Sequence, residues 1–154
     1  MPEGAGDVLS FVSEVRFDPA MLEKLAGLHE KIRATFARIG ASAKLGATAA
    51  TADAVRACIA ELHELNRLES LRLYPVIARQ LGTQPGAMAE FTKLRLSVYG
   101  VGRKFLRVLE GAVSGVEGVI GAADLCLAAT LLERYIGEKQ AKLYPLYCAA
   151  PRDA

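Results

Sequence analysis

Apolar residues recur at three- and four-residue steps along four long stretches of the chain, and this spacing is the strongest constraint on its fold. An α-helix turns once in about 3.6 residues, so the spacing gathers the apolar side chains on one helix face. The stretches cover roughly residues 22–39, 53–82, 83–109 and 122–146, and the connections between them are short. No strand-like alternation competes over a comparable length. The sequence therefore predicts an all-α fold, an antiparallel up-down four-helix bundle.

Length and composition favour a single globular domain. The chain has 154 residues, of which 52% are apolar and 23% charged, a balance typical of a chain that buries a core. We expect one domain over residues 1–154, with an N-terminal arm over 1–18 and the bundle over about 19–148.

Charge and hydropathy exclude several classes of partner. A formal net charge of +2 is too weak to indicate a nucleic-acid or membrane-surface partner. No uncharged apolar run approaches the length of about 18 residues that a membrane span needs, and the first residues lack the features of a signal peptide. These features lead us to expect a cytoplasmic protein whose partners are a second protein or a second copy of the chain.

Prolines and glycines predict where the helices begin, bend and end. Asp18 and Pro19 provide an N-cap and a first-turn proline, and Gly40 is a natural stop for the first helix. Pro75 falls inside the second apolar stretch, where the missing N–H should kink or end the helix locally. Gly82 should end that helix.

The chain carries a short internal repeat. Leu73-Tyr74-Pro75 recurs as Leu143-Tyr144-Pro145, 70 positions later. Moving the first apolar stretch by the same 70 positions superimposes its apolar face on that of the third stretch. This pattern suggests two helical hairpins related by a pseudo-twofold axis, and we interpret the two Tyr-Pro pairs as packing features at helix ends.

Polar residues interrupt the apolar face of every expected helix. Helical bundles build metal and cofactor sites in this way, from side chains of facing helices that point to one internal place. The alternative is that long polar side chains at the edge of each face reach out to water. The interrupting residues are His29, Glu69, Tyr99 (or Arg95), and Tyr135 with Lys139.

Two of these segments resemble a known family. Leu65 to Pro75 is similar to the second helix of hemerythrin-like (HHE cation-binding) domains, in which a histidine, an acid four residues later and an aromatic–proline pair follow one another. Glu69 stands at the acid position and Leu65 at the histidine position. In the segment that resembles the last helix, Tyr135 stands at the histidine position and Lys139 at the acid position.

The resemblance covers about residues 18–148 and implies a non-haem di-iron centre, held by several histidines and a pair of bridging carboxylates and used for oxygen binding, sensing or storage. His29 matches the family's first-helix histidine. The third-helix histidine falls on Tyr99, with Arg95 and Phe91 as less favoured positions. The chain has only two histidines, so a full histidine-rich di-iron site cannot form, and the cofactor stays unknown.

The substituted residues suggest what replaces the metal. A lysine and a glutamate buried at one level must pair, because either charge alone would cost several kcal/mol to bury. We therefore expect a hydrogen-bonded cluster of His29, Glu69, Tyr135 and Lys139, with Tyr99 lining it.

Three functions remain open. The first is a hemerythrin-like protein without di-iron that acts as a signalling or interaction module. The second is an unorthodox metal or haem site for oxygen or redox sensing, built on His29, Glu69 and Tyr135, to which Glu138 is a possible addition. The third is an enzyme that uses a buried Lys/Tyr pair; no catalytic triad, phosphate-binding loop or zinc-spaced cysteine cluster is visible to support other chemistry.

Overall fold

The described part of the chain is helical almost throughout. The computed structural model describes residues 15–114 and 120–149, and none of these residues lies in a β-strand, which confirms the all-α class. The elements are α2 (Met21–Lys44), α3 (Thr48–Leu68), η1 (Glu69–Leu73), α4 (Tyr74–Leu81), α5 (Pro85–Ser114), α6 (Ala122–Glu138), η2 (Lys139–Leu143) and α7 (Tyr144–Cys148). Because α3 continues through η1 into α4, and α6 through η2 into α7, the described residues form four long helical stretches, consistent with a helical bundle.

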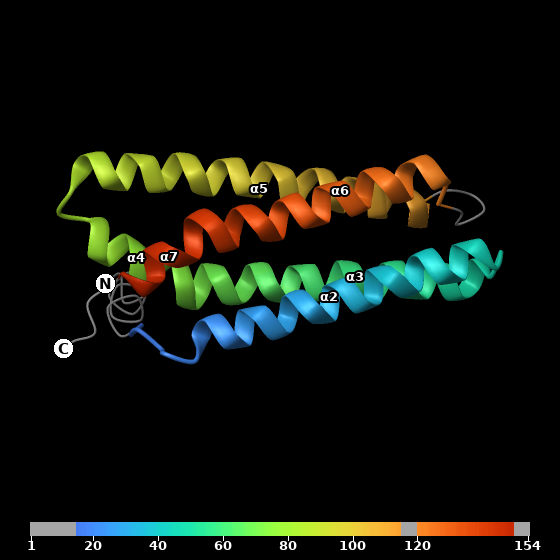
Figure 1. Ribbon diagram of the computed structural model, residues 1–154, viewed down its shortest axis with the longest axis horizontal. Helices are drawn as coiled ribbons and strands as arrows, with labels where there is room; N and C mark the ends of the chain where they lie inside the picture. The colour runs from blue at the N-terminus through green and yellow to red at the C-terminus, as the bar shows by residue number, and fades with distance from the viewer. Residues whose placement is uncertain (1–14, 115–119, 150–154) are drawn as a thin grey trace, which may run out of the picture.

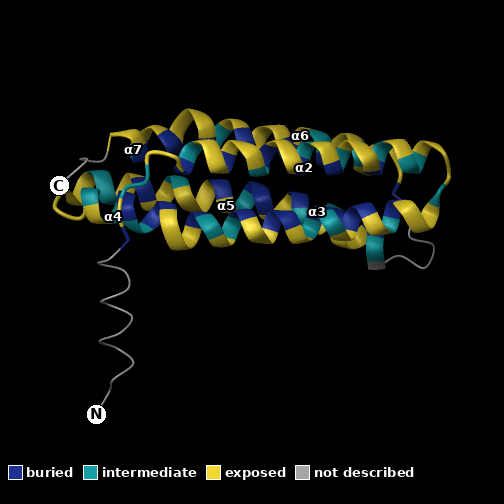
Figure 2. Ribbon diagram, turned by 90° about the horizontal axis from the view of Figure 1, so that it is seen from below, coloured by how far each residue is buried: buried dark blue, intermediate teal, exposed yellow. Residues whose placement is uncertain are grey.

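The long helices lie along one another. Figure 1 shows α2 beside α3 and α5 beside α6, and the two pairs lie one above the other. The short helices α4 and α7 meet at one end of the molecule. Buried residues line the inner sides of the helices and exposed residues their outer sides (Figure 2). Among the described residues no helix is both long enough and apolar enough to span a membrane.

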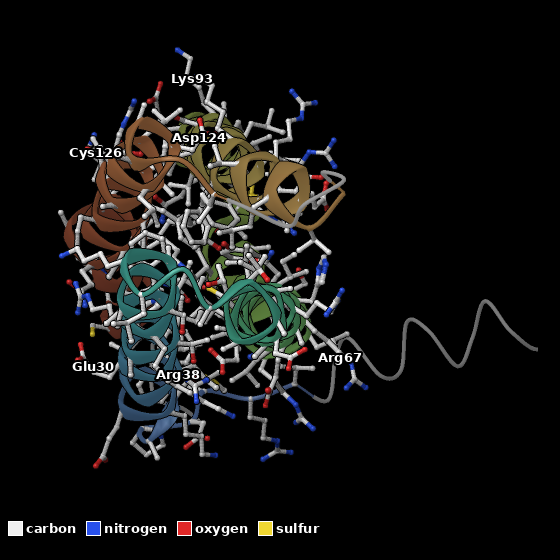
Figure 3. The ribbon with its side chains drawn as sticks, turned by 90° about the vertical axis from the view of Figure 1, so that its right-hand side faces the viewer. Glu30, Arg38, Arg67, Lys93, Asp124 and Cys126 are labelled. Atoms are coloured by element: carbon white, nitrogen blue, oxygen red, sulfur yellow. The ribbon has the colours of Figure 1, made fainter. Side chains whose placement is uncertain are left out.

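Side chains from all four stretches fill the middle of the bundle. In the view along the helices (Figure 3), charged residues such as Glu30, Arg67 and Lys93 point outward. The core between the helices is mostly aliphatic, as the apolar periodicity predicts. Its fully buried members include Leu25, Ile32, Ile39, Leu65, Leu73, Ile77, Phe105, Leu109, Ala128, Ile136 and Leu143.

The start of the bundle is anchored by a turn. Of the expected N-terminal arm, residues 1–14 lie outside the described residues, and residues 15–18 form neither helix nor strand. Asp18 precedes the first helix rather than capping it directly: α2 begins at Met21, and an Asp18 carboxylate oxygen accepts the Ala20 N–H at 2.9 Å. The Asp18 N–H donates to the hydroxyl of Tyr147 at 2.6 Å, which ties this turn to α7.

The first helix is longer than the sequence predicts. α2 passes through Gly40 and ends at Lys44. A mid-helix glycine costs only about 1 kcal/mol relative to alanine, which packing along the rest of the helix outweighs. Gly46, two residues after the end of α2, has a φ of 68°, the left-handed conformation that terminates helices and favours glycine. Gly82, by contrast, follows the last residue of α4 as predicted.

Each Tyr-Pro pair follows one turn of π-helix. In η1 the Tyr74 N–H donates to the Glu69 carbonyl, and in η2 the Tyr144 N–H donates to the Lys139 carbonyl, so each bond spans five residues. A proline cannot donate to the preceding turn, and the widened turn lets the helix restart with that proline in its first turn. The predicted local disturbance at Pro75 is therefore confirmed.

Candidate functional site

A buried ion pair lies where the two π-helical segments face each other. Glu69 and Lys139 begin η1 and η2, and their exposed fractions are 1% and 0%. The Lys139 ammonium nitrogen lies 3.3 Å from Glu69 Oε1 and 3.1 Å from Oε2. Removing either charge would leave the other without a counter-ion in the core, a loss of several kcal/mol. This is the ion pair that the sequence predicts.

Tyr144 is a further hydrogen-bond partner of the Glu69 carboxylate, and nothing in the sequence predicts this contact. Its hydroxyl donates to Glu69 Oε2 at 2.6 Å and lies 3.2 Å from Nε2 of His29. Burial, followed by the negative charge of Glu69, raises the pKa of Tyr144 far above its usual value, so the phenol keeps its proton. The π-turn explains its position: it holds Lys139 and Tyr144, five residues apart, on the same buried face of the helix.

His29 is held as a neutral imidazole. The single Tyr144 hydroxyl proton is directed at Glu69, so His29 Nε2 must carry the hydrogen and donate it to the Tyr144 oxygen. His29 Nδ1 is then a bare acceptor, and it has no hydrogen-bond partner in the described structure. Burial, followed by the positive charges of Lys139 and Arg33, lowers the pKa of His29 to about 3.

Tyr135 lies beneath the ion pair and points its hydroxyl elsewhere. The Lys139 ammonium nitrogen is 3.8 Å from the centre of the Tyr135 ring, a cation–π contact. The Tyr135 hydroxyl donates to Asn66 Oδ1 at 2.6 Å. Of the four residues expected in one cluster, Lys139 therefore contacts Glu69 directly, and Tyr144 links Glu69 to His29. Tyr135 contacts this network through its ring.

Tyr99 lies at the exposed edge of this cluster. It is 57% exposed, and it follows the buried Val98 on α5. The Tyr135 ring occupies the inner space at this level: a Cβ on Gly102 would come within 2.8 Å of it. Tyr99 therefore lines the open side of the site, in one pocket wall with Glu69 and Tyr135, and not its buried interior. Arg95 is exposed as well, whereas Phe91 is buried in the core.

The residues at this place do not fit the di-iron centre that the resemblance implies. The ammonium group of Lys139 already neutralises the Glu69 carboxylate, and it would repel a metal ion from the same oxygens. Leu65, at an expected histidine position, is fully buried and has no ligand atom. Within residues 15–114 and 120–149, no group of three or more His, Cys, Asp or Glu side chains is placed to hold a metal ion.

The Lys/Tyr pair of the enzyme hypothesis exists, but it is closed off. Burial lowers the pKa of Lys139 to about 8, against the opposing effect of Glu69. Such a lysine is a nucleophile only if a substrate reaches it. The Lys139 side chain is 0% exposed, so the folded protein offers no direct access to its nitrogen.

A pocket of about 400 Å³ opens beside the cluster. The end of α3 and η1 form one side of it, and the first half of α5 forms the other. Asn66, Glu69 and Tyr135 form part of its wall, so the pocket reaches the edge of the buried network. Leu96 and Tyr99 also line it, with exposed fractions of 65% and 57%. No sequence pattern predicts this pocket, because its size depends on the distance between two helices.

Comparison with known proteins adds no relative. No protein-family model, no curated protein and no solved structure matches the chain. The resemblance to hemerythrin-like domains therefore rests on this chain's own residues, above all on the spacing from Glu69 to Pro75 and from Lys139 to Pro145.

Proposed function

We propose that the chain is an antiparallel up-down bundle of the hemerythrin-like type that has lost the di-iron centre and acts as a signalling or interaction module. An internal ion pair takes the place of the metal in this proposal. The module would work through its surface and its pocket, in contact with a protein partner or a second copy of the chain. A cytoplasmic location is part of the same proposal.

One observation carries the proposal. The Lys139 nitrogen contacts both oxygens of the Glu69 carboxylate, at 3.3 Å and 3.1 Å. Tyr144 donates a further hydrogen bond to the same group. The only family-type carboxylate in the cluster is therefore satisfied by the protein itself, and the positive charge that two metal ions would bring is supplied by a side chain.

The direct test is metal content. Untagged protein would be analysed by inductively coupled plasma mass spectrometry and visible absorption, before and after iron is added anaerobically. We expect no stoichiometric metal in either sample. About two irons per chain would overturn the proposal, and about one metal ion or a haem band would favour the alternative site built on His29, Glu69 and Tyr135.

A second experiment tests the resemblance itself. The substitutions Leu65→His, Tyr135→His and Lys139→Glu restore the family's residue types on both repeat segments. We expect the triple variant to gain iron binding that the native protein lacks. A control with the same residue types at exposed positions, Leu71→His, Leu127→His and Lys142→Glu, should not gain it. A folded triple variant that binds no more iron than this control would contradict the hemerythrin-like assignment.

The interaction role has its own measurement. Multi-angle light scattering over a range of concentrations distinguishes a self-associating module from a monomer that needs another partner. Exposed apolar side chains on α5, Leu96 and Tyr99, are the positions where substitution by serine should weaken self-association.

A further inference from the structure

The pocket beside the buried cluster has the size and lining of a small-molecule site. Its volume of about 400 Å³ lies in the range of such sites. The apolar part of the wall comes mainly from aromatic and flexible side chains, which adapt to a ligand's shape. These are Tyr74, Met88, Phe91, Leu96 and Tyr99, and Val98 completes the apolar wall.

The internal repeat explains why the pocket is open. Leu25 and His29 of the first half correspond, 70 positions later, to Arg95 and Tyr99 of the second. Leu25 and His29 are fully buried, and the His29 ring stacks on Tyr144 at 5.8 Å. Arg95 and Tyr99 are exposed instead. The place that one half fills with core side chains is therefore left open in the other half.

Arg95 puts one positive charge at this opening. Its guanidinium lies 4.2 Å from the centre of the Tyr74 ring. Within residues 15–114 and 120–149 it makes no ion pair, whereas Arg33 is bound to Glu133 at 2.9 Å. A guanidinium held against a ring keeps N–H groups that can receive a carboxylate through two parallel hydrogen bonds.

The other polar groups of the wall add donors and no free negative charge. The Glu69 carboxylate is neutralised by Lys139 and bonded by Tyr144. Since Asn66 Oδ1 accepts the Tyr135 hydroxyl, the Asn66 amide nitrogen remains to donate to a ligand. The pocket thus combines an apolar interior with one uncompensated cation and a neutral donor.

We propose that this pocket binds a small apolar monocarboxylate, with the carboxylate on Arg95 and the hydrocarbon or aromatic body between Tyr74, Phe91 and Val98. The inference deepens the proposed function, because it gives the module a ligand. Arg95 and the apolar wall are not candidate metal ligands, so iron binding by the native protein would refute the module but would not remove the groups that hold the carboxylate and its hydrocarbon body. A phosphate ester is a poorer match, because a dianion would meet only one guanidinium.

Calorimetric titration of the full-length protein tests the proposal, with octanoate as the probe. Octanol and octylammonium, of equal chain length, separate the role of the charge from that of the chain. We expect octanoate to bind more tightly than either, and the affinity to rise about fourfold per added methylene from butanoate until the pocket is full. Equal binding of the three compounds, tighter binding of octylammonium, or no binding of octanoate at millimolar concentration would overturn the proposal.

Two variants locate the site. Arg95→Gln should weaken octanoate binding about tenfold or more and leave octanol binding unchanged. Arg107→Gln, on the same helix but outside the pocket, should change neither. In two-dimensional amide NMR spectra of the native protein, octanoate should shift the signals of Asn66, Ser70 and Thr92, which line the pocket. Octanoate binding that Arg95→Gln does not weaken, or shifts confined to other regions, would refute the assignment.

Discussion

Acid should destabilise this protein through His29 well above the pH at which its carboxylates titrate. In the folded state burial keeps the imidazole neutral, with a pKa of about 3. In the unfolded chain a histidine takes up its proton near pH 6.5. Between these values the unfolded state binds more protons than the folded state. The free energy of unfolding must therefore fall as the pH falls through this window.

The size of the effect depends little on the folded-state pKa. At about pH 5 the unfolded histidine is almost fully protonated while folded His29 is not, and linkage gives a loss of about 2 kcal/mol relative to pH 8. The groups that surround the ring do not offset this loss. Lys139 and Arg33 oppose a second positive charge, and Tyr144 and the paired Glu69 offer no uncompensated anion.

Proton NMR and urea unfolding measure the two sides of this linkage. The chain has only two histidines, so the His29 and His63 ring signals can be assigned with the single variants His29→Gln and His63→Gln. In the native protein the His29 signal should not titrate above about pH 4. The His29→Gln variant should lose the roughly 2 kcal/mol of acid dependence, and His63→Gln, at an exposed position, should keep it. A His29 signal that titrates near pH 6.5 in the folded protein would refute the reasoning.

The remaining predictions concern the buried ion pair and two glycines of α5. Lys139→Met leaves Glu69 buried without its cation and should lower the free energy of unfolding by about 3–5 kcal/mol. Adding Glu69→Leu should restore most of this loss, because no charge then remains unpaired. Urea titration of the single and double variants measures both effects, and additive losses would contradict the direct pairing. Gly102→Ala should cost about 1–3 kcal/mol, since its Cβ would lie 2.8 Å from the Tyr135 ring. Gly100→Ala, whose Cβ would meet nothing within 4 Å, should stabilise the same helix by up to about 1 kcal/mol. Thermal unfolding compares the two glycine variants, and equal changes in stability would show that the Tyr135 ring moves aside without cost.

The helices and the central ion pair were accessible to sequence reasoning because both follow from local spacing and from charge. Three-and-four periodicity fixes which residues face inward, and Glu69 and Lys139 stand on that inward face. Two opposite charges at one buried level have one low-energy arrangement, which is to pair. The ion pair could therefore be predicted from helical spacing, from charge and from the resemblance that places Glu69 and Lys139 at matching positions.

Tyr144, Tyr99 and the pocket could not be predicted in the same way. A π-turn adds one residue to a helical turn and rotates everything that follows it, so ideal periodicity misplaces Tyr144. The repeated proline was the only signal of this irregularity. On α5 Val98 is buried and Tyr99 is exposed, and the Tyr135 ring fills the space beside Gly102 on the same helix. The pocket depends on the distance between helices, which no local pattern records.

The internal repeat gives the lysine at position 139 a physical meaning. Glu69 and Lys139 occupy equivalent positions, 70 residues apart, and they contact each other directly. Two acids at these positions would repel each other in a core that excludes water, and bound cations would be needed to hold them together. A lysine at one of the two positions supplies that cation from within the chain. The Glu69 carboxylate can then stay charged and buried without any metal. Position 65, where the resemblance implies a histidine ligand, can then carry a leucine that packs in the core.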